Sequence, residues 1–171
     1  MKNKSLLKVL FLLSIVLFSH CKKDSQENYF IYDGKTYTIA GGVLGSGSHD
    51  IMSGAYNYVL TLYSSGLTYN STTDNISGSG ELMFFLVSSY TSDFQSRTYN
   101  YNSTSTATAP GTYSGCWLKH NLITTTNSST NIELYTGSLG IVKTGSSFSI
   151  NINIKTRDGK SITGYYKGPI E

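Results

Sequence analysis

The stretch SFSININIK, residues Ser147 to Lys155, decides the fold class of this 171-residue chain. Apolar side chains recur there at every second position, at Phe148, Ile150, Ile152 and Ile154, and polar side chains fill the positions between them. Successive side chains of a β-strand point to opposite faces of a sheet, so this alternation is typical of a strand with one buried face. The stretch therefore predicts a half-buried strand.

Two Asp-Gly pairs predict tight hairpins near the two ends of the body. Asp158-Gly159 joins the alternating stretch to a returning strand at residues 161–167, and Asp33-Gly34 separates strands at 29–32 and 35–40. Asp and Gly both tolerate the positive φ that a type I′ turn requires of its two central residues.

Further strands are expected between these hairpins. The segment Leu82 to Val87 is apolar at every position, which indicates a central strand that is buried, or covered by a loop, on both faces. Turn-rich segments, expected to be loops, lie at residues 41–50, 66–80, 103–114 and 121–130. The remaining strands are expected at residues 55–63, 81–90, 98–102, 115–120, 131–136 and 138–143.

These strands predict one all-β domain, because no crossover helices are present to join parallel strands. We expect a single antiparallel β-sandwich or small flattened barrel of about 8–9 strands, with a lipocalin-like barrel as the alternative. Composition agrees: Ser, Thr, Asn and Gly make up 75 residues and Ala only four, which disfavours a helical bundle.

Charge argues against a nucleic-acid partner. Three of the 13 Lys and Arg residues lie in the first eight positions, so the rest of the chain carries 10 basic and 10 acidic side chains. Binding to phosphates by counterion release needs clustered basic side chains, and no basic stripe is present. With 39% hydrophobic residues the chain can still bury a core.

The N-terminus has the pattern of a secretory signal peptide. The basic segment Met1 to Lys8 precedes the mostly apolar run Val9 to Phe18, which as a helix covers roughly 15 Å of a bilayer core that is about 30 Å thick. The run is too short to span a membrane comfortably. Residues 1–20 are therefore predicted to be removed on export.

Cys21 directly follows this run and is succeeded by Lys22, Lys23 and Asp24. A cysteine in this position resembles the lipobox of bacterial lipoproteins, and the CKKD start is similar to that of many lipoproteins from the Bacteroidota. The segments 32–37 and 137–168 also resemble small uncharacterised Bacteroidota lipoproteins with sandwich or lipocalin-like folds. The resemblance implies fatty acylation of Cys21 and an anchor in the outer membrane of the bacterial cell envelope, on its periplasmic or its surface face. Residues 22–28 contain no apolar side chain, so residues 21–28 are expected to be the lipidated cysteine and a polar tether, followed by the β-domain at 29–171.

The residues suggest no catalytic centre, metal site or cofactor. Cys116 and His120 are four positions apart on one expected strand, roughly 13 Å between Cα atoms, which is too far for a nucleophile and its base. Cys116 is interpreted as a packing residue and His49 as part of a solvated turn. There is no C-x-x-C, H-x-x-x-H or EF-hand spacing.

Aromatic side chains remain as candidate ligand-binding residues. Strand alternation places most tyrosines in the core but leaves Trp117, Tyr63 and Tyr165 on the polar faces of their strands. Exposed rings commonly bind sugars or small apolar ligands, so these three residues are the candidates for such contacts. The alternative is packing under a loop or across strands.

Three functions therefore stay open. The first is a non-enzymatic binding or accessory module, which predicts an apolar cavity, a ligand site in a barrel mouth or an exposed ring cluster. The second is a glycan-acting hydrolase, which predicts two carboxylates within about 5 to 10 Å of each other in a cleft. The third is a structural or adhesive surface protein, which predicts neither feature.

Overall fold

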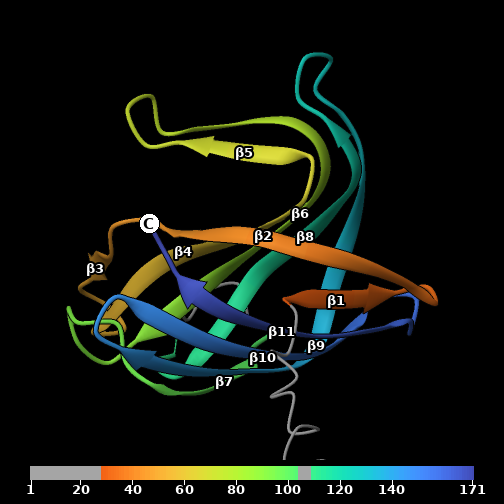
Figure 1. Ribbon diagram of the computed structural model, residues 1–171. Coiled ribbons are helices and arrows are strands. Elements are labelled where there is room, and N and C mark those ends of the chain that lie inside the picture. The colour runs from red at the N-terminus through yellow and green to blue at the C-terminus, as the bar shows by residue number, and fades with distance from the viewer. Residues whose placement is uncertain (1–27, 104–108) are drawn as a thin grey trace, which may run out of the picture.

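The computed structural model describes residues 28–103 and 109–171, which form an all-β body (Figure 1). The expected signal peptide, Cys21 and most of the expected tether lie outside these residues. Within the described ranges, no helix is long and apolar enough to cross a membrane. The strands are β1 (Tyr29–Tyr32), β2 (Lys35–Leu44), β3 (Ser48–Asp50), β4 (Ala55–Ser64), β5 (Leu67–Asn70), β6 (Asn75–Ser89), β7 (Arg97–Tyr101), β8 (Thr112–Ile123), β9 (Ser128–Thr144), β10 (Ser147–Thr156) and β11 (Ser161–Pro169).

Eight of the strands close into a ring. Neighbouring strands pair antiparallel in the order β1, β2, β4, β6, β8, β9, β10 and β11. The ring closes because β11 also pairs antiparallel with β1. The sheet is therefore a flattened barrel with up-and-down strand order, and it confirms the predicted all-β antiparallel domain. Closure also removes the exposed edges that an open sheet would present to other chains.

Side chains from every strand of the ring fill the interior. Ile150, Ile152 and Ile154 on β10 are at most 3% exposed, so the predicted alternation of residues 147–155 is confirmed. Large rings such as Tyr99, Tyr113 and Phe85 occupy the same core. An eight-stranded barrel can be filled by side chains or hold one small ligand, and the core side chains fill the interior of this one.

The two end hairpins pair with each other through β1 and β11. Asp33 and Gly34 both have positive φ, 51° and 74°, as the prediction requires. At the other hairpin only Gly159 does, at 84°, so the expectation of two positive-φ residues is wrong there. That loop is longer: the Thr156 amide donates to the Lys160 carbonyl at 2.8 Å, and the chain reverses over four residues.

The two strands expected at 131–136 and 138–143 are one continuous strand, β9. Gly137, which separates the two expected strands, has a φ of 117°, and a Cβ at this position would lie 2.2 Å from the Asn153 carbonyl oxygen. Gly137 pairs with Ile154, so the glycine lets β9 continue in close contact with the backbone of β10. The register shifts further along, where Lys155 pairs with Thr136 and Thr156 pairs with Leu134, which leaves Tyr135 as a bulge.

Short strands also occur in segments expected to be loops. β3 extends the hairpin with β4, and β5 extends the hairpin with β6 beyond the ring. β7 lies between the N-terminal half of β8 and the C-terminal half of β9, and its contact with β8 is parallel. The β5/β6 and β8/β9 hairpins project from the ring in Figure 1.

Candidate functional site

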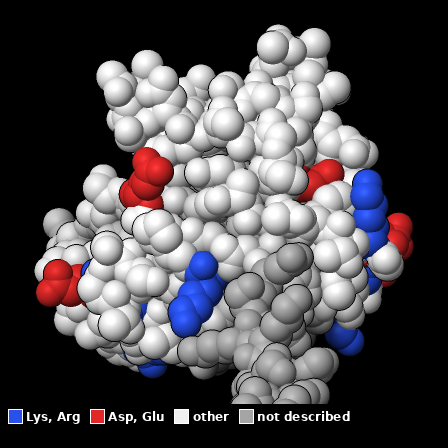
Figure 2. Space-filling model, in the orientation of Figure 1, with Lys and Arg blue, Asp and Glu red and all other residues white. Residues whose placement is uncertain are grey.

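A hollow of about 410 Å³ lies between the projecting tips of two hairpins. Figure 2 shows the tips as two projections separated by a notch, with charged side chains dispersed over the rest of the visible face. The floor comes from the outer face of β2, β4 and β6. One wall is the tip of the β5/β6 hairpin, and the other is the outer face of β8 together with the β8/β9 tip. Its lining residues are Val43, Thr61, Tyr69, Asp74, Asn75, Ile76, Leu82, Lys119, Leu122, Thr124 and Asn127.

Two glycines shape the β5/β6 tip. Gly66 and Gly78 have φ of 94° and 116°, and the Ser79 amide donates to the Gly66 carbonyl at 2.9 Å. A Cβ on Gly78 would lie 2.1 Å from the Gly66 oxygen, and a Cβ on Gly66 would lie 2.3 Å from the Ser79 oxygen. Only glycine permits backbones this close, so these residues allow the hairpin to change direction above the ring.

The base of the β5/β6 hairpin is hydrogen-bonded to the turn of the β8/β9 hairpin. The Gly78 amide donates to the Thr124 hydroxyl at 2.9 Å, and the Thr124 amide donates to the Gly78 carbonyl at 3.1 Å. This contact joins residues 46 positions apart and fixes the base of the β5/β6 hairpin against the β8/β9 turn. The walls of the hollow are therefore held in place by hydrogen bonds.

A buried carboxylate stabilises the bases of both hairpins. Glu81 is 5% exposed, and its carboxylate lies 2.8 Å from His120 Nδ1 and accepts a hydrogen bond from the Asn121 amide at 3.2 Å. The Glu81 amide donates to Ser64 Oγ at 2.7 Å. Glu81 thus links β4, β6 and β8 immediately below the hollow.

The Glu81–His120 pair leaves no local pattern in the sequence, because the two residues lie 39 positions apart. One signal was present: Glu81 is an acid placed directly before an apolar strand, and a buried acid needs a partner. The ring of Tyr32 lies edge-on to His120 with centroids 5.6 Å apart, and the ring of Tyr37 does so at 6.1 Å. These contacts indicate a packed position for the histidine.

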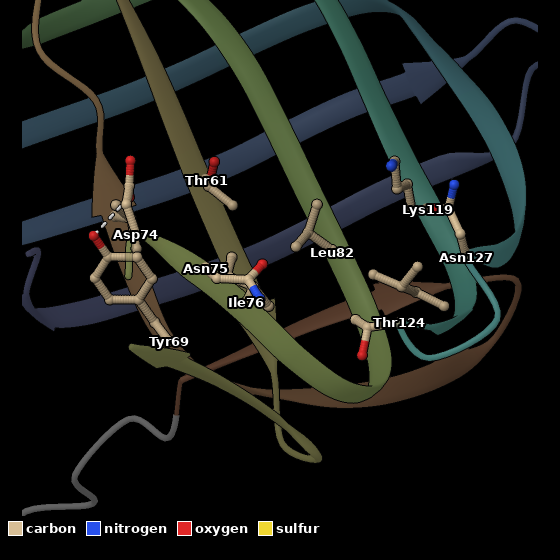
Figure 3. A pocket seen from close by; sticks show the side chains of 11 residues that line it. Thr61, Tyr69, Asp74, Asn75, Ile76, Leu82, Lys119, Thr124 and Asn127 are labelled. Carbon is tan, nitrogen blue, oxygen red and sulfur yellow. Dashed lines mark hydrogen bonds between the residues drawn. The ribbon is translucent and has the colours of Figure 1, made fainter. Parts of the chain in front are cut away.

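Opposite walls of the hollow carry opposite charges (Figure 3). On one wall the Tyr69 hydroxyl donates to Asp74 Oδ1 at 2.8 Å, and this hydrogen bond is the main cause of the raised pKa of the Tyr69 phenol. On the other wall lie Lys119 and Asn127. Leu82 lies between the walls, so the site combines polar sides with an apolar floor.

Trp117 lies on the outer face of β8, below the hollow, and is 36% exposed. It is paired across the sheet with Phe84 on β6 and with Glu133 on β9. On β6, Met83, Phe85 and Val87 face the core, whereas Leu82, Phe84 and Leu86 are half-buried on the outer face. The expected burial of both faces is therefore correct for the inner face and partial for the outer one.

Tyr63 and Tyr165 are half-buried on β4 and β11. The Tyr63 ring covers Gly41, where a Cβ would lie 2.4 Å from the tyrosine oxygen. Tyr165 accepts a hydrogen bond from Ser149 Oγ at 3.2 Å. Trp117, Tyr63 and Tyr165 occupy different strands and none of them lines the hollow, so their role in ligand binding stays a prediction.

Cys116 is a buried packing residue, 2% exposed, as interpreted from the sequence. Burial raises the pKa of its thiol to about 12, and Sγ donates to the Leu134 carbonyl at 3.1 Å.

His49 is exposed but lies on β3, where the centroid of its ring is 4.6 Å from that of Tyr56. The expectation of a turn at this residue is therefore wrong. Among the described residues, no group of three or more His, Cys, Asp or Glu side chains could hold a metal ion.

Comparisons with protein-family models, with curated proteins and with solved structures give no match for this chain. The chemistry of the hollow and the N-terminal sequence are therefore the features that indicate a function.

Proposed function

We propose that this protein is a lipid-anchored, non-enzymatic binding module of a bacterial envelope, and that its ligand occupies the hollow between the hairpin tips. The observation that carries the proposal is the hollow itself, because its volume of about 410 Å³ falls within the size of small-molecule sites, about 300–1,000 Å³. The ring interior is filled by side chains. The ligand class is a carbohydrate or a small molecule with an apolar part.

The polar lining supports ligand binding. The side chains of Thr61, Asn75, Lys119 and Asn127 make no hydrogen bond to any residue in the described part of the chain, although all four line the hollow. Such groups have donors and acceptors available for a ligand. Leu82, Ile76 and Val43 supply the apolar surface that a sugar ring or an alkyl group would contact.

The anchor is proposed from the residues that precede the barrel. In the proposal, Cys21 is acylated in the manner of Bacteroidota-type lipoproteins, the protein is held at the outer membrane, and residues 22–28 form the tether. The Asn28 side chain donates to the Lys167 carbonyl at 3.2 Å and accepts from the Lys167 amide at 2.7 Å. These bonds attach the end of the tether to β11. Two or more acyl chains, at about 0.8 kcal/mol per buried CH₂, would make the attachment lasting.

The anchor is tested by mass spectrometry of protein purified from membranes. We expect an N-terminal peptide that starts at Cys21 and carries fatty acyl mass, and a Cys21→Ser variant that leaves the membrane fraction. A wild-type peptide that retains residues 1–20, or an unmodified Cys21 thiol, would rule out the anchor.

Ligand binding is tested by screening saccharides and small apolar ligands against the full-length protein in detergent. The Asn75→Trp variant places a large ring in the hollow, and Asn153→Trp places the same ring on the exposed outer face of β10 as a matched control. We expect a hit from the screen to lose at least tenfold in affinity with Asn75→Trp and to bind Asn153→Trp normally. Equal effects of the two substitutions would contradict the assignment of the hollow.

A further inference from the structure

We propose that the hollow selects zwitterionic ligands, with an ammonium group at one end, an anionic group at the other and a short apolar body between them. This inference rests on the proposed function, because it assumes that the hollow is the ligand site. It goes further in naming the charge pattern of the ligand.

Asp74 supplies the anionic wall. It is the one acidic residue that lines the hollow, and it belongs to none of the ion pairs among the described residues. The Tyr69 hydroxyl occupies Oδ1, which leaves Oδ2 free to accept from a ligand ammonium. The Asn70 side chain accepts from the Thr72 and Thr73 amides at 2.9 and 3.2 Å, so the turn that presents Asp74 is held in one shape.

Lys119 supplies the cationic wall. It is the one basic residue that lines the hollow, it is half-buried on β8, and its ammonium forms no ion pair or hydrogen bond within the described ranges. Asn127 lies beside it and adds an amide that can donate to the same anionic group (Figure 3). A ligand carboxylate would therefore find two donors on this wall.

The two charged walls face the same space without pairing with each other. Figure 3 shows Tyr69 and Asp74 on one side, Lys119 and Asn127 on the other, and Leu82 with Ile76 between them. A zwitterion can satisfy both walls at once and place its apolar body on the floor. A singly charged ligand leaves one wall unpaired, and a neutral sugar leaves both charges without a counter-charge. The selection follows from this difference in pairing.

The test uses one body in three charge states. Leucyl-leucine is a zwitterion at pH 7, N-acetyl-leucyl-leucine lacks the ammonium, and leucyl-leucine amide lacks the carboxylate; maltose serves as the neutral probe. Isothermal titration of the full-length protein in detergent should show leucyl-leucine binding at least tenfold tighter than each of the others, which is about 1.4 kcal/mol.

Variants assign each charge to its wall. Asp74→Asn should lower the affinity for leucyl-leucine at least tenfold and leave the acetylated peptide unchanged, and Lys119→Gln should do the same while leaving the amide unchanged. Asn tolerates the positive φ of residue 74, so the turn is kept. Asp93→Asn and Lys143→Gln, at exposed positions away from the hollow, are the charge-matched controls and should bind as the wild type does.

Three results would overturn the inference. The first is equal binding of the three peptides. The second is an equal loss with hollow and control variants. The third is preferential binding of maltose that Asn75→Trp abolishes, which would leave the proposed function standing with a neutral ligand. If no probe and no compound from the wider screen binds in a manner sensitive to Asn75→Trp, the proposed function fails together with the inference.

Discussion

At the residue scale, Cys116 shows how burial controls reactivity. Its thiol has a pKa raised to about 12 because the surrounding core disfavours the thiolate, and only the thiolate attacks alkylating agents. We expect folded, acylated protein to resist iodoacetamide at pH 8 and to take up one equivalent when it is unfolded in urea. Rapid modification in the folded state, followed by mass spectrometry, would contradict the burial of this residue.

The same raised pKa predicts how stability depends on pH. The unfolded state releases the Cys116 proton above about pH 9, whereas the folded state keeps it until about pH 12. The stabilising contribution is therefore complete below pH 9 and is lost as the pH rises toward 12. Burial raises the pKa of Tyr113 in the same direction. Urea unfolding followed by fluorescence should show lower stability at pH 10.5 than at pH 8, with a smaller difference in Cys116→Val.

Glu81 and Glu133 offer a comparison of two carboxylates with basic partners. Glu81 is buried below the hollow, whereas Glu133 pairs with Arg157 at the surface, with side chains 31% and 69% exposed. We expect Glu81→Gln to lower the free energy of unfolding by about 1–3 kcal/mol because the buried amide cannot replace every carboxylate contact. Glu133→Gln should cost less than about 1 kcal/mol. Chemical denaturation measures both, and equal costs would show that Glu81 has no special structural role.

At the element scale, the direction of the β5/β6 hairpin depends on Gly78. Gly78→Ala would place a Cβ against the Gly66 oxygen in addition to the strain of positive φ. Gly145→Ala, at a φ of 60° with no atom within 4 Å of the added Cβ, isolates that strain. We expect about 1 kcal/mol for the Gly145 variant and about 1–3 kcal/mol more for the Gly78 variant. Similar melting temperatures for the two variants would contradict this close backbone approach.

The strands themselves were largely predictable, since their alternation depends on neighbouring residues. Residues 147–155 were recognised because a buried face imposes a period of two on any strand. The expected break at residue 137 is wrong because a glycine can lie inside a strand as well as between two strands, and only the pairing of β9 with β10 distinguishes these cases. β3 and β5 were missed because their short sequences carry few apolar residues, and they form by extending β4 and β6.

The site was much less predictable than the fold. Its lining extends from Val43 to Asn127 and comes from five strands and the ends of two hairpins. No local sequence pattern indicates how far a hairpin bends or which other hairpin it contacts. The Gly78–Thr124 contact and the Glu81–His120 pair are both long-range, so they appear only after the ring has closed. The aromatic residues chosen from alternation alone therefore lie outside the hollow.

At the scale of the whole molecule, the closed ring separates packing from binding. Core side chains from all eight strands occupy the interior, and the hollow lies on the outer face where two hairpins extend beyond the ring. Figure 1 shows the two tips along the upper edge, while β1 begins lower in the molecule. In the proposed arrangement the tether therefore joins the body away from the hollow, which leaves the site free while the protein is anchored.

Methyl NMR tests the assignment of the hollow most directly, because methyl groups line both the hollow and the core. In the full-length protein in detergent, leucyl-leucine or a saccharide hit should shift the methyl resonances of Val43, Ile76 and Leu82 and leave those of Ile150 and Ile152 unchanged. Shifts confined to the core isoleucines would place the ligand inside the ring, and that result would contradict the account.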